Sequence, residues 1–73
     1  MRIEAIEEAV HARLFVPFRI VLPSDRALPV PHPDFVSISP NRKWFIVWNK
    51  RGGTSWVEPG LIVELAFNGM RRR

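Results

Sequence analysis

Three prolines occupy alternate positions in residues 28–33, LPVPHP, and they constrain the fold more than any other feature of the chain. In an antiparallel strand, alternate residues direct their backbone amides to the same edge. The missing donors of this segment therefore all lie along one edge, at Pro29, Pro31 and Pro33. The residues between them keep their amides for a neighbour, which we expect to be the segment FRIVL at 18–22. The pattern predicts an edge strand whose outer side resists further pairing.

The N-terminal segment has the apolar spacing of a helix. Ile3, Ile6, Val10 and Leu14 fall on one stripe. Glutamates lie early and an arginine late, as the helix dipole favours. Since Pro17 pushes the residue before it toward extended geometry, we expect a helix over about 2–14.

Apolar segments with strand character follow the helix, separated by tight turns. KWFIVWN is dense in aromatic and β-branched residues, and KRGG after it is typical of a hairpin loop. Residues 35–38 are expected to plug one end of the core. Including the proline segment, we expect strands at about 18–22, 27–32, 43–49, 54–58 and 61–67. This order predicts an α+β fold in which the helix packs on a small antiparallel, strongly bent or barrel-like sheet of about five strands.

The chain is short and has no cysteine. Its 73 residues favour one domain over 1–73, and such a domain buries only about 60% of its unfolded surface. No disulfide or cysteine-based zinc site can add stability, so an oligomer interface would help. No serine lies in a glycine-flanked elbow, KRGGTS lacks the spacing of a phosphate loop, and a deep pocket is difficult to build at this size. We expect a protein that is not an enzyme and needs no cofactor.

The net charge is +4, and three of the positive charges come from the tail at 70–73. Such a tail is either a solvated end or a contact for phosphate groups, through Arg71, Arg72 and Arg73. A bilayer-spanning helix needs a run of about 18 apolar residues, and no run in this chain approaches that length. The first residues do not resemble a signal peptide. We expect a cytoplasmic protein without a membrane partner.

Much of the chain, about residues 5–67, resembles a group of short uncharacterised bacterial proteins. The shared pattern is PF-x-I-x-L, then V-P-H-P-x-F, then S-P before a strong strand. The matching residues here are Pro17, Phe18, Ile20, Leu22, Val30, Pro31, His32, Pro33, Phe35, Ser39 and Pro40. This resemblance implies a shared fold and no particular chemistry.

A more remote resemblance is to Sm-like and SH3-like small barrels. The order of one helix and five strands is similar, and WVEPGLIVELAF lies where the Sm-like family has its fourth strand, turn and fifth strand. The resemblance implies a ring oligomer that binds RNA. The chain departs from that family at the prolines of 29–33, where the family has a long central strand. It also lacks the histidine-containing uridine-pocket motif.

His32 and Asp34 are the nearest approach to a metal site. Zinc usually needs three or four ligands, and no further cluster accompanies these two. A structural histidine bonded to the backbone is the better interpretation.

The tryptophans form the most informative set. Trp44 and Trp48 share a strand face with Ile46, while Phe45 and Val47 share the other. Both faces are apolar, so either both are buried or one is an interface. We expect a partner-binding surface made of Trp44, Trp48 and Trp56 with a basic rim of Arg42, Lys43, Lys50 and Arg51. A homo-oligomer or protein partner is the favoured occupant, and the alternative is a stacking platform for RNA or single-stranded nucleic acid.

Overall fold

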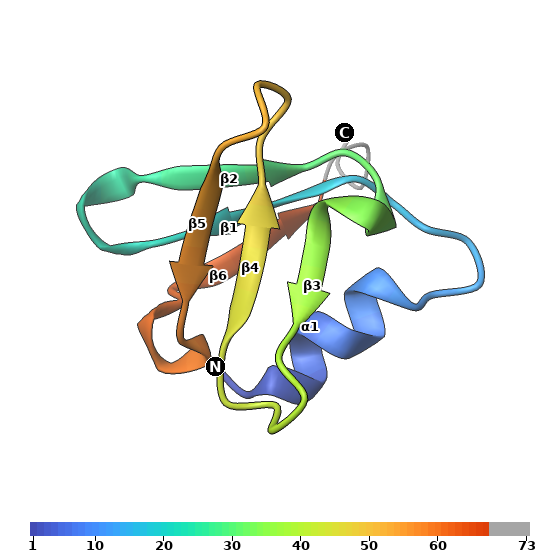
Figure 1. Ribbon diagram of the computed structural model, residues 1–73, viewed down its shortest axis with the longest axis horizontal. Helices are drawn as coiled ribbons and strands as arrows, with labels where there is room; N and C mark the ends of the chain where they lie inside the picture. Colours follow the sequence, from blue (N-terminus) through green and yellow to red (C-terminus); the bar gives the residue numbers. More distant parts are fainter. Residues whose placement is uncertain (68–73) are drawn as a thin grey trace.

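The computed structural model describes residues 1–67 (Figure 1). One helix, α1 (Ile3–Val10), precedes the strands, and short 3-10 turns at Pro23–Asp25, Pro33–Phe35 and Pro59–Leu61 interrupt them. The strands are β1 (Phe18–Val21), β2 (Ala27–Val30), β3 (Val36–Ile38), β4 (Phe45–Trp48), β5 (Thr54–Val57) and β6 (Glu64–Phe67). The predicted α+β class is confirmed.

Helix α1 is shorter than predicted. It ends at Val10, and His11 follows as a cap whose backbone N–H donates to the Glu7 carbonyl. Ile6 and Val10 are buried in the core, whereas Leu14, which we placed on the same stripe, is 86% exposed. The chain uses residues 11–17 to return to the start of β1 (Figure 1), so the helical spacing continues in the sequence beyond the helix itself.

Within residues 1–67 the strands form two three-stranded antiparallel sheets instead of a single bent sheet of about five strands, and these strands do not close into a barrel. The first sheet has the order β2–β1–β6, and the second has the order β3–β4–β5. The segment that we expected only to plug the core supplies the additional strand β3. Pro31 and Pro33 interrupt the chain between β2 and β3, so what could be one long strand becomes two strands in separate sheets.

The last predicted strand, 61–67, is also shorter. A 3-10 turn takes Leu61, and β6 begins at Glu64. Its partner is β1 of the same chain, with Phe18 opposite Phe67. Strand 61–67 therefore pairs within the chain.

The proline segment lies where the sequence placed it. Strand β2 is at the edge of its sheet, and Pro29 lies opposite Arg19. The backbone N–H of Leu22 donates to the Arg26 carbonyl at 2.7 Å, so these two residues form a hydrogen-bonded pair. Hydrogen-bonded and non-hydrogen-bonded pairs alternate in an antiparallel ladder, so Leu28 and Val30 also form hydrogen-bonded pairs with β1. The amide position of Pro29 thus points outward. The predicted edge strand is confirmed, but it ends at Val30 instead of about residue 32, so only Pro29 blunts its outer side and Pro31 and Pro33 lie beyond it.

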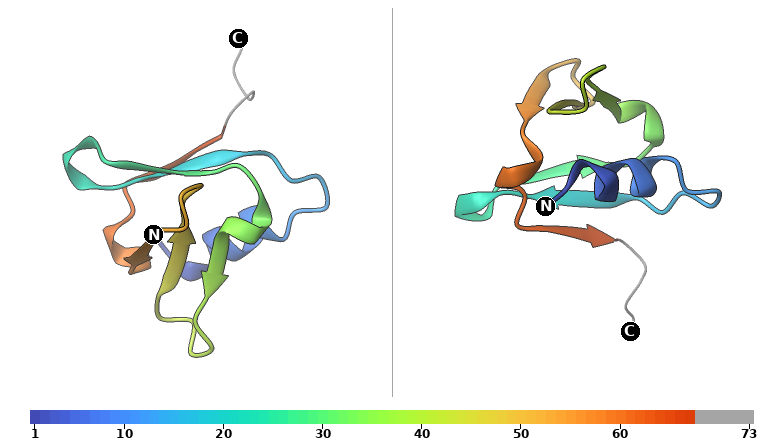
Figure 2. Two further views of the ribbon diagram at one scale, coloured as in Figure 1. Left: turned by 45° about the horizontal axis from the view of Figure 1, so that its top comes forward. Right: turned by 90° about the horizontal axis from the view of Figure 1, so that it is seen from below.

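The core lies between the two sheets, and α1 closes one side of it (Figure 2). Its largest fully buried side chains come from the helix and from both sheets, and they are Ile6, Phe18, Ile20, Val30 and Phe45. Each sheet therefore packs one of its faces against this core. The other face of the second sheet carries the tryptophans.

Candidate binding surface

Strand β4 divides its side chains between the core and the surface. Phe45 and Val47 are buried, while Ile46 is half-buried and Trp48 is 40% exposed. Ile46 lies opposite Trp56 of β5. Because side chains alternate along a strand, Trp44, Ile46, Trp48 and Trp56 share the outer side of the sheet, and we call these four residues the aromatic face. The predicted sharing of faces is thus observed.

Two tryptophans of the aromatic face are stacked on each other. The ring centroids of Trp44 and Trp56 lie 4.9 Å apart, and the ring planes differ by 3°. Trp44 is half-buried, whereas Trp56 is 69% exposed. Offset-stacked pairs of this kind gain about 0.5–1.5 kcal/mol beyond simple burial. The pair forms a preformed aromatic stack at one end of β4 and β5, with Trp56 as its more exposed member.

Trp48 lies apart from this pair. It ends β4 and lies opposite Thr54, next to the hairpin loop. The aromatic face therefore has two parts, the Trp44–Trp56 pair at one end of the strands and Trp48 at the other.

A hydrogen-bonded turn positions Trp44. The hydroxyl of Ser39, which is only 5% exposed, donates to Asn41 Oδ1 at 2.7 Å and accepts from the backbone N–H groups of Lys43 and Trp44. The Ser39 backbone N–H donates to the Trp44 carbonyl at 3.0 Å. Arg42 takes a left-handed backbone, with φ of 60°, to complete the turn. Residues 39–43 thus fix the point where Trp44 enters the sheet.

The hairpin loop presents two basic residues. Asn49 Oδ1 accepts from the backbone N–H groups of Arg51 and Gly53, each at 2.9 Å. These bonds hold a tight loop in which Lys50 and Arg51 are exposed. The loop places both cations near Trp48, in agreement with the sequence pattern that flanks the tryptophans with charge.

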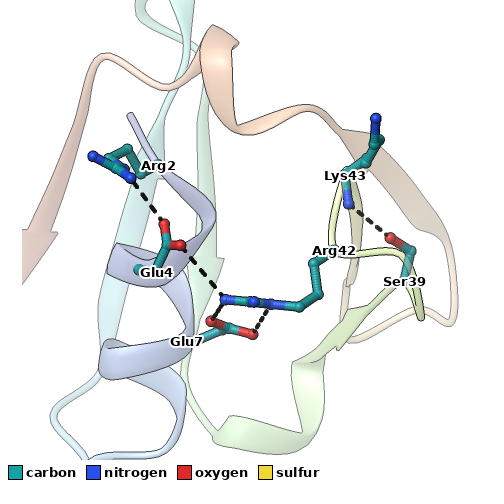
Figure 3. Close-up of polar contacts among 6 residues, drawn as sticks. All are labelled: Arg2, Glu4, Glu7, Ser39, Arg42 and Lys43. Carbon is teal, nitrogen blue, oxygen red and sulfur yellow. Dashed lines mark hydrogen bonds and ion pairs between the residues drawn. The ribbon is translucent and has the colours of Figure 1, made fainter.

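Arg42 has a different position from the other basic residues. Its guanidinium donates from Nε to Glu7 Oε2 at 2.8 Å and from a second nitrogen to the other oxygen of the same carboxylate (Figure 3). Glu4 lies 3.6 Å from it. The hydrogen bonds from Arg42 lower the pKa of Glu7, and the same contact raises the pKa of Arg42.

Lys43 points away from this ion-pair cluster (Figure 3). Among residues 1–67, the predicted rim thus contains one arginine paired with α1 and three cations outside any ion pair, namely Lys43, Lys50 and Arg51. The predicted phosphate contacts Arg71, Arg72 and Arg73 lie outside the described residues.

A groove of about 410 Å³ borders the stacked pair. It is lined by Trp44, Trp56, Val57, Glu58 and Leu61. Sequence reasoning did not assign Glu58 or Leu61 to the site. The available signal was the spacing of Trp56 and Glu58, which are two residues apart on an extended segment and therefore on one side of it.

A second hollow, of about 440 Å³, lies between α1 and β6. Its walls are almost entirely apolar, and its lining residues are Ala5, Glu8, Ala9, Ala12, Leu14, Val16, Leu65 and Phe67. The tryptophans take no part in it.

His32 and Asp34 form a local turn. His32 Nδ1 accepts a hydrogen bond from the Asp34 backbone N–H at 3.2 Å, and the Asp34 carboxylate lies 3.6 Å from the same nitrogen. His32 thus has the expected bond to the backbone, although its side chain is 62% exposed. Within residues 1–67 no three metal-ligating side chains come together.

The comparisons with known proteins give no match to this chain, whether with family models, curated proteins or solved structures. The resemblances drawn from the sequence patterns therefore stay predictions. In the part of the chain that the structure describes, no helix has both the length and the apolar character to cross a membrane.

Proposed function

We propose that this protein is a non-enzymatic binding module whose contact surface is the aromatic face of the sheet β3–β4–β5. The partner is a protein surface, and a second copy of the chain is the first candidate. The expected location is the cytoplasm, which suits a chain without cysteine.

One observation carries the proposal. The tryptophans lie on the outer side of a sheet whose inner side already covers the core, and Trp48 and Trp56 keep large exposed fractions. Tryptophan is enriched in protein interfaces and dominates their binding energy, because it provides a large desolvated area with few rotatable bonds. In a domain this small, leaving such residues exposed gives up hydrophobic stabilisation, which burial against a partner would restore.

The basic residues contribute orientation more than binding energy. Lys43, Lys50 and Arg51 are exposed at the two ends of the aromatic face. Charges at a rim steer the encounter toward complementary charge on the partner and fix the register of the contact. The proposal therefore gives the tryptophans the buried centre of the contact and these cations its edge.

The test is the mass in solution, by light scattering at low and at high salt, of the wild-type protein and of Trp48→Gln. Trp48 is chosen because it is exposed and separate from the stacked pair. A discrete multimer that persists at high salt and dissociates in Trp48→Gln supports self-association through the aromatic face. A multimer unaffected by the substitution contradicts the use of this face. A pure monomer excludes the second copy and makes a different protein the partner.

A second candidate is the binding of RNA or single-stranded nucleic acid. The observation that favours it is the exposed ring of Trp56 in a parallel stacked pair, with Lys43 directly before Trp44. Bases stack on such rings, and cations follow the phosphate backbone. Absorbance at 260 and 280 nm during the same measurement tests it. Co-purified nucleic acid that is lost at high salt supports this candidate, because phosphate binding weakens steeply with salt.

A further inference from the structure

The groove beside the stacked pair combines aromatic rings with a carboxylate. Glu58 directly follows β5, and its backbone is extended, with φ of −95° and ψ of 134°. Its side chain therefore lies on the same side as that of Trp56, with the two α-carbons about 6–7 Å apart along the strand. Phe45 lies opposite Val57, so continuing the register by one position puts Trp44 opposite Glu58. The carboxylate and both rings thus share one corner of the sheet.

The free side of Trp56 is the open wall of this corner. Trp44 covers one side of the Trp56 ring at 4.9 Å, and the ring is 69% exposed, so its other side faces solvent. Tryptophan is the best aromatic partner for a cation placed over its ring, because the face of the ring carries negative charge. Leu61, also exposed, adds an apolar wall to the groove.

The charge of the groove selects the ligand. Glu58 is the one ionisable residue among the groove's lining residues, and none of the ion pairs within residues 1–67 involves it. A phosphate would meet this carboxylate at close range and be repelled. A cation would meet an aromatic ring and an opposite charge together.

We infer that the groove binds the guanidinium group of an arginine side chain presented by the partner protein. The plane of the guanidinium stacks on the open side of Trp56, and its N–H groups donate to the Glu58 carboxylate. This inference deepens the proposed function and rests on it, because it names the chemistry of the partner at one part of the same surface.

Arginine suits the groove better than lysine. The Trp56 ring lies parallel to the Trp44 ring to within 3°, and a planar guanidinium can stack on the free face of Trp56 while directing its edge to a carboxylate. The lysine ammonium is compact and strongly hydrated, so it gives up more solvation to reach the ring. The groove is open to solvent at Trp56 and Leu61, so an arginine on a protein surface can enter it without rearrangement of the fold.

The three tryptophan indole N–H signals in a two-dimensional NMR spectrum provide the test. The full chain is titrated with the peptide acetyl-Gly-Arg-Gly-amide and, separately, with its twin in which citrulline replaces arginine. Citrulline has nearly the same shape and no charge. We expect the arginine peptide to move the signals of Trp44 and Trp56 saturably, to leave that of Trp48 in place, and to bind more tightly than the citrulline peptide.

Two variants locate the site. Glu58→Gln removes the charge and keeps the shape, and we expect about threefold weaker binding of the arginine peptide, as is typical for an exposed ion pair. Glu64→Gln is the matched control, because Glu64 is an exposed carboxylate outside the groove. Its binding should equal that of the wild type. Equal weakening in both variants would mean that only the overall charge matters, and would overturn the inference.

Three other results also overturn it. The arginine peptide could move no indole signal, or the citrulline peptide could bind equally well, which would make the groove merely apolar. The triple variant R71Q, R72Q and R73Q could itself shift the signals of Trp44 and Trp56 in the absence of peptide, which would make the chain's own tail the occupant. The light-scattering test with Trp48→Gln uses no residue of the groove, so the proposed function can survive when the arginine site fails.

Discussion

Arg42 and Glu7, which are 35 residues apart, are joined by two hydrogen bonds between one guanidinium and one carboxylate. Glu7 belongs to α1, and Arg42 belongs to the turn between β3 and β4. The pair therefore ties the helix to the second sheet (Figure 3). Arg42 belongs to the same turn that leads to Trp44. Two-point pairing of this kind fixes orientation as well as distance.

The Arg42–Glu7 contact predicts a pH-dependent stability. Arg42 lowers the pKa of Glu7 from its ordinary value of 4.5. A carboxylate whose pKa is depressed in the folded state stabilises that state above its unfolded pKa, and the contribution disappears as the pH falls through the folded value. We expect Glu7→Gln to be less stable than the wild type at neutral pH and the difference to shrink as the pH drops below about 4.5. Urea unfolding from neutral pH to about pH 3 measures it.

Glu8→Gln is the matched control for this prediction. Glu8 lies on the same helix and is exposed, and no ion pair within residues 1–67 includes it. Its substitution should leave the difference between neutral and acid stability nearly unchanged. If both variants lose the same amount at neutral pH, the effect is general helix electrostatics and the specific role of Arg42 is refuted.

Ser39→Ala should destabilise the protein and loosen Trp44. The buried hydroxyl accepts from the Trp44 backbone N–H at 3.3 Å, and its removal leaves that partly buried donor without this partner. An unsatisfied buried group costs about 1–3 kcal/mol. We expect a loss of that size in urea unfolding, accompanied by a change in the near-ultraviolet circular dichroism of the stacked tryptophans.

Ser37→Ala is the control for this prediction, because it removes a serine hydroxyl near β4 without affecting the hydrogen bonds of Ser39. Ser37 is exposed on β3, opposite Ile46. Substitution at such a surface position usually changes stability by less than about 0.5 kcal/mol. A loss in Ser37→Ala as large as that in Ser39→Ala would show that the hydrogen bonds of the 39–43 turn are not the cause.

Local chemistry in the sequence predicted the edge strand and the aromatic face, because each depends on alternation along one strand. Pro29 removes an amide from the outer edge, whatever the strand pairs with, whereas Pro31 and Pro33 end the strand that the sequence pattern extends through them. In the same way, Trp44, Ile46 and Trp48 share a face as soon as the segment is extended. These predictions did not need the neighbouring strands to be known.

The features that the sequence did not predict depend on contacts between distant segments. The charge of Arg42 favours a basic rim, yet its partner Glu7 is 35 residues earlier in the chain. Residues 36–38 form the strand β3 because they pair with β4, with Ile38 opposite Phe45. Leu14 has the right spacing for a helix that has already ended. In each case the local pattern allows two structures, and the tertiary contact selects one.

The hairpin loop gives a prediction about Gly52. Its φ is 89°, a left-handed conformation that a residue with a Cβ adopts at a cost of about 1–2 kcal/mol. Gly52→Ala should lose about that amount of stability, although a Cβ would meet nothing within 4 Å. The loss would therefore come from backbone strain alone, and urea unfolding would measure it.

Gly60→Ala is the control for this position. A Cβ at Gly60 also meets nothing within 4 Å, and its backbone does not require a left-handed φ. Because alanine restricts the unfolded chain more than glycine does, we expect no loss, or a gain of up to about 1 kcal/mol. Equal losses at the two glycines would contradict the role of the left-handed conformation at Gly52.

Pro29→Val tests what the proline segment does for the fold. Pro29 is exposed on the edge strand β2, and its amide position points away from β1. Valine keeps the residue apolar and favours a strand, but it restores an outward-pointing N–H on an otherwise unpaired edge. Such edges pair with other chains. We expect the substitution to preserve folding and to raise the average mass in light scattering as protein concentration increases. Pro59→Val is the control, because Pro59 begins a 3-10 turn and borders no sheet edge. If Pro29→Val stays at the mass of the wild type at every concentration, the prolines do not protect this edge, and the shortness of β2 alone is sufficient to prevent pairing.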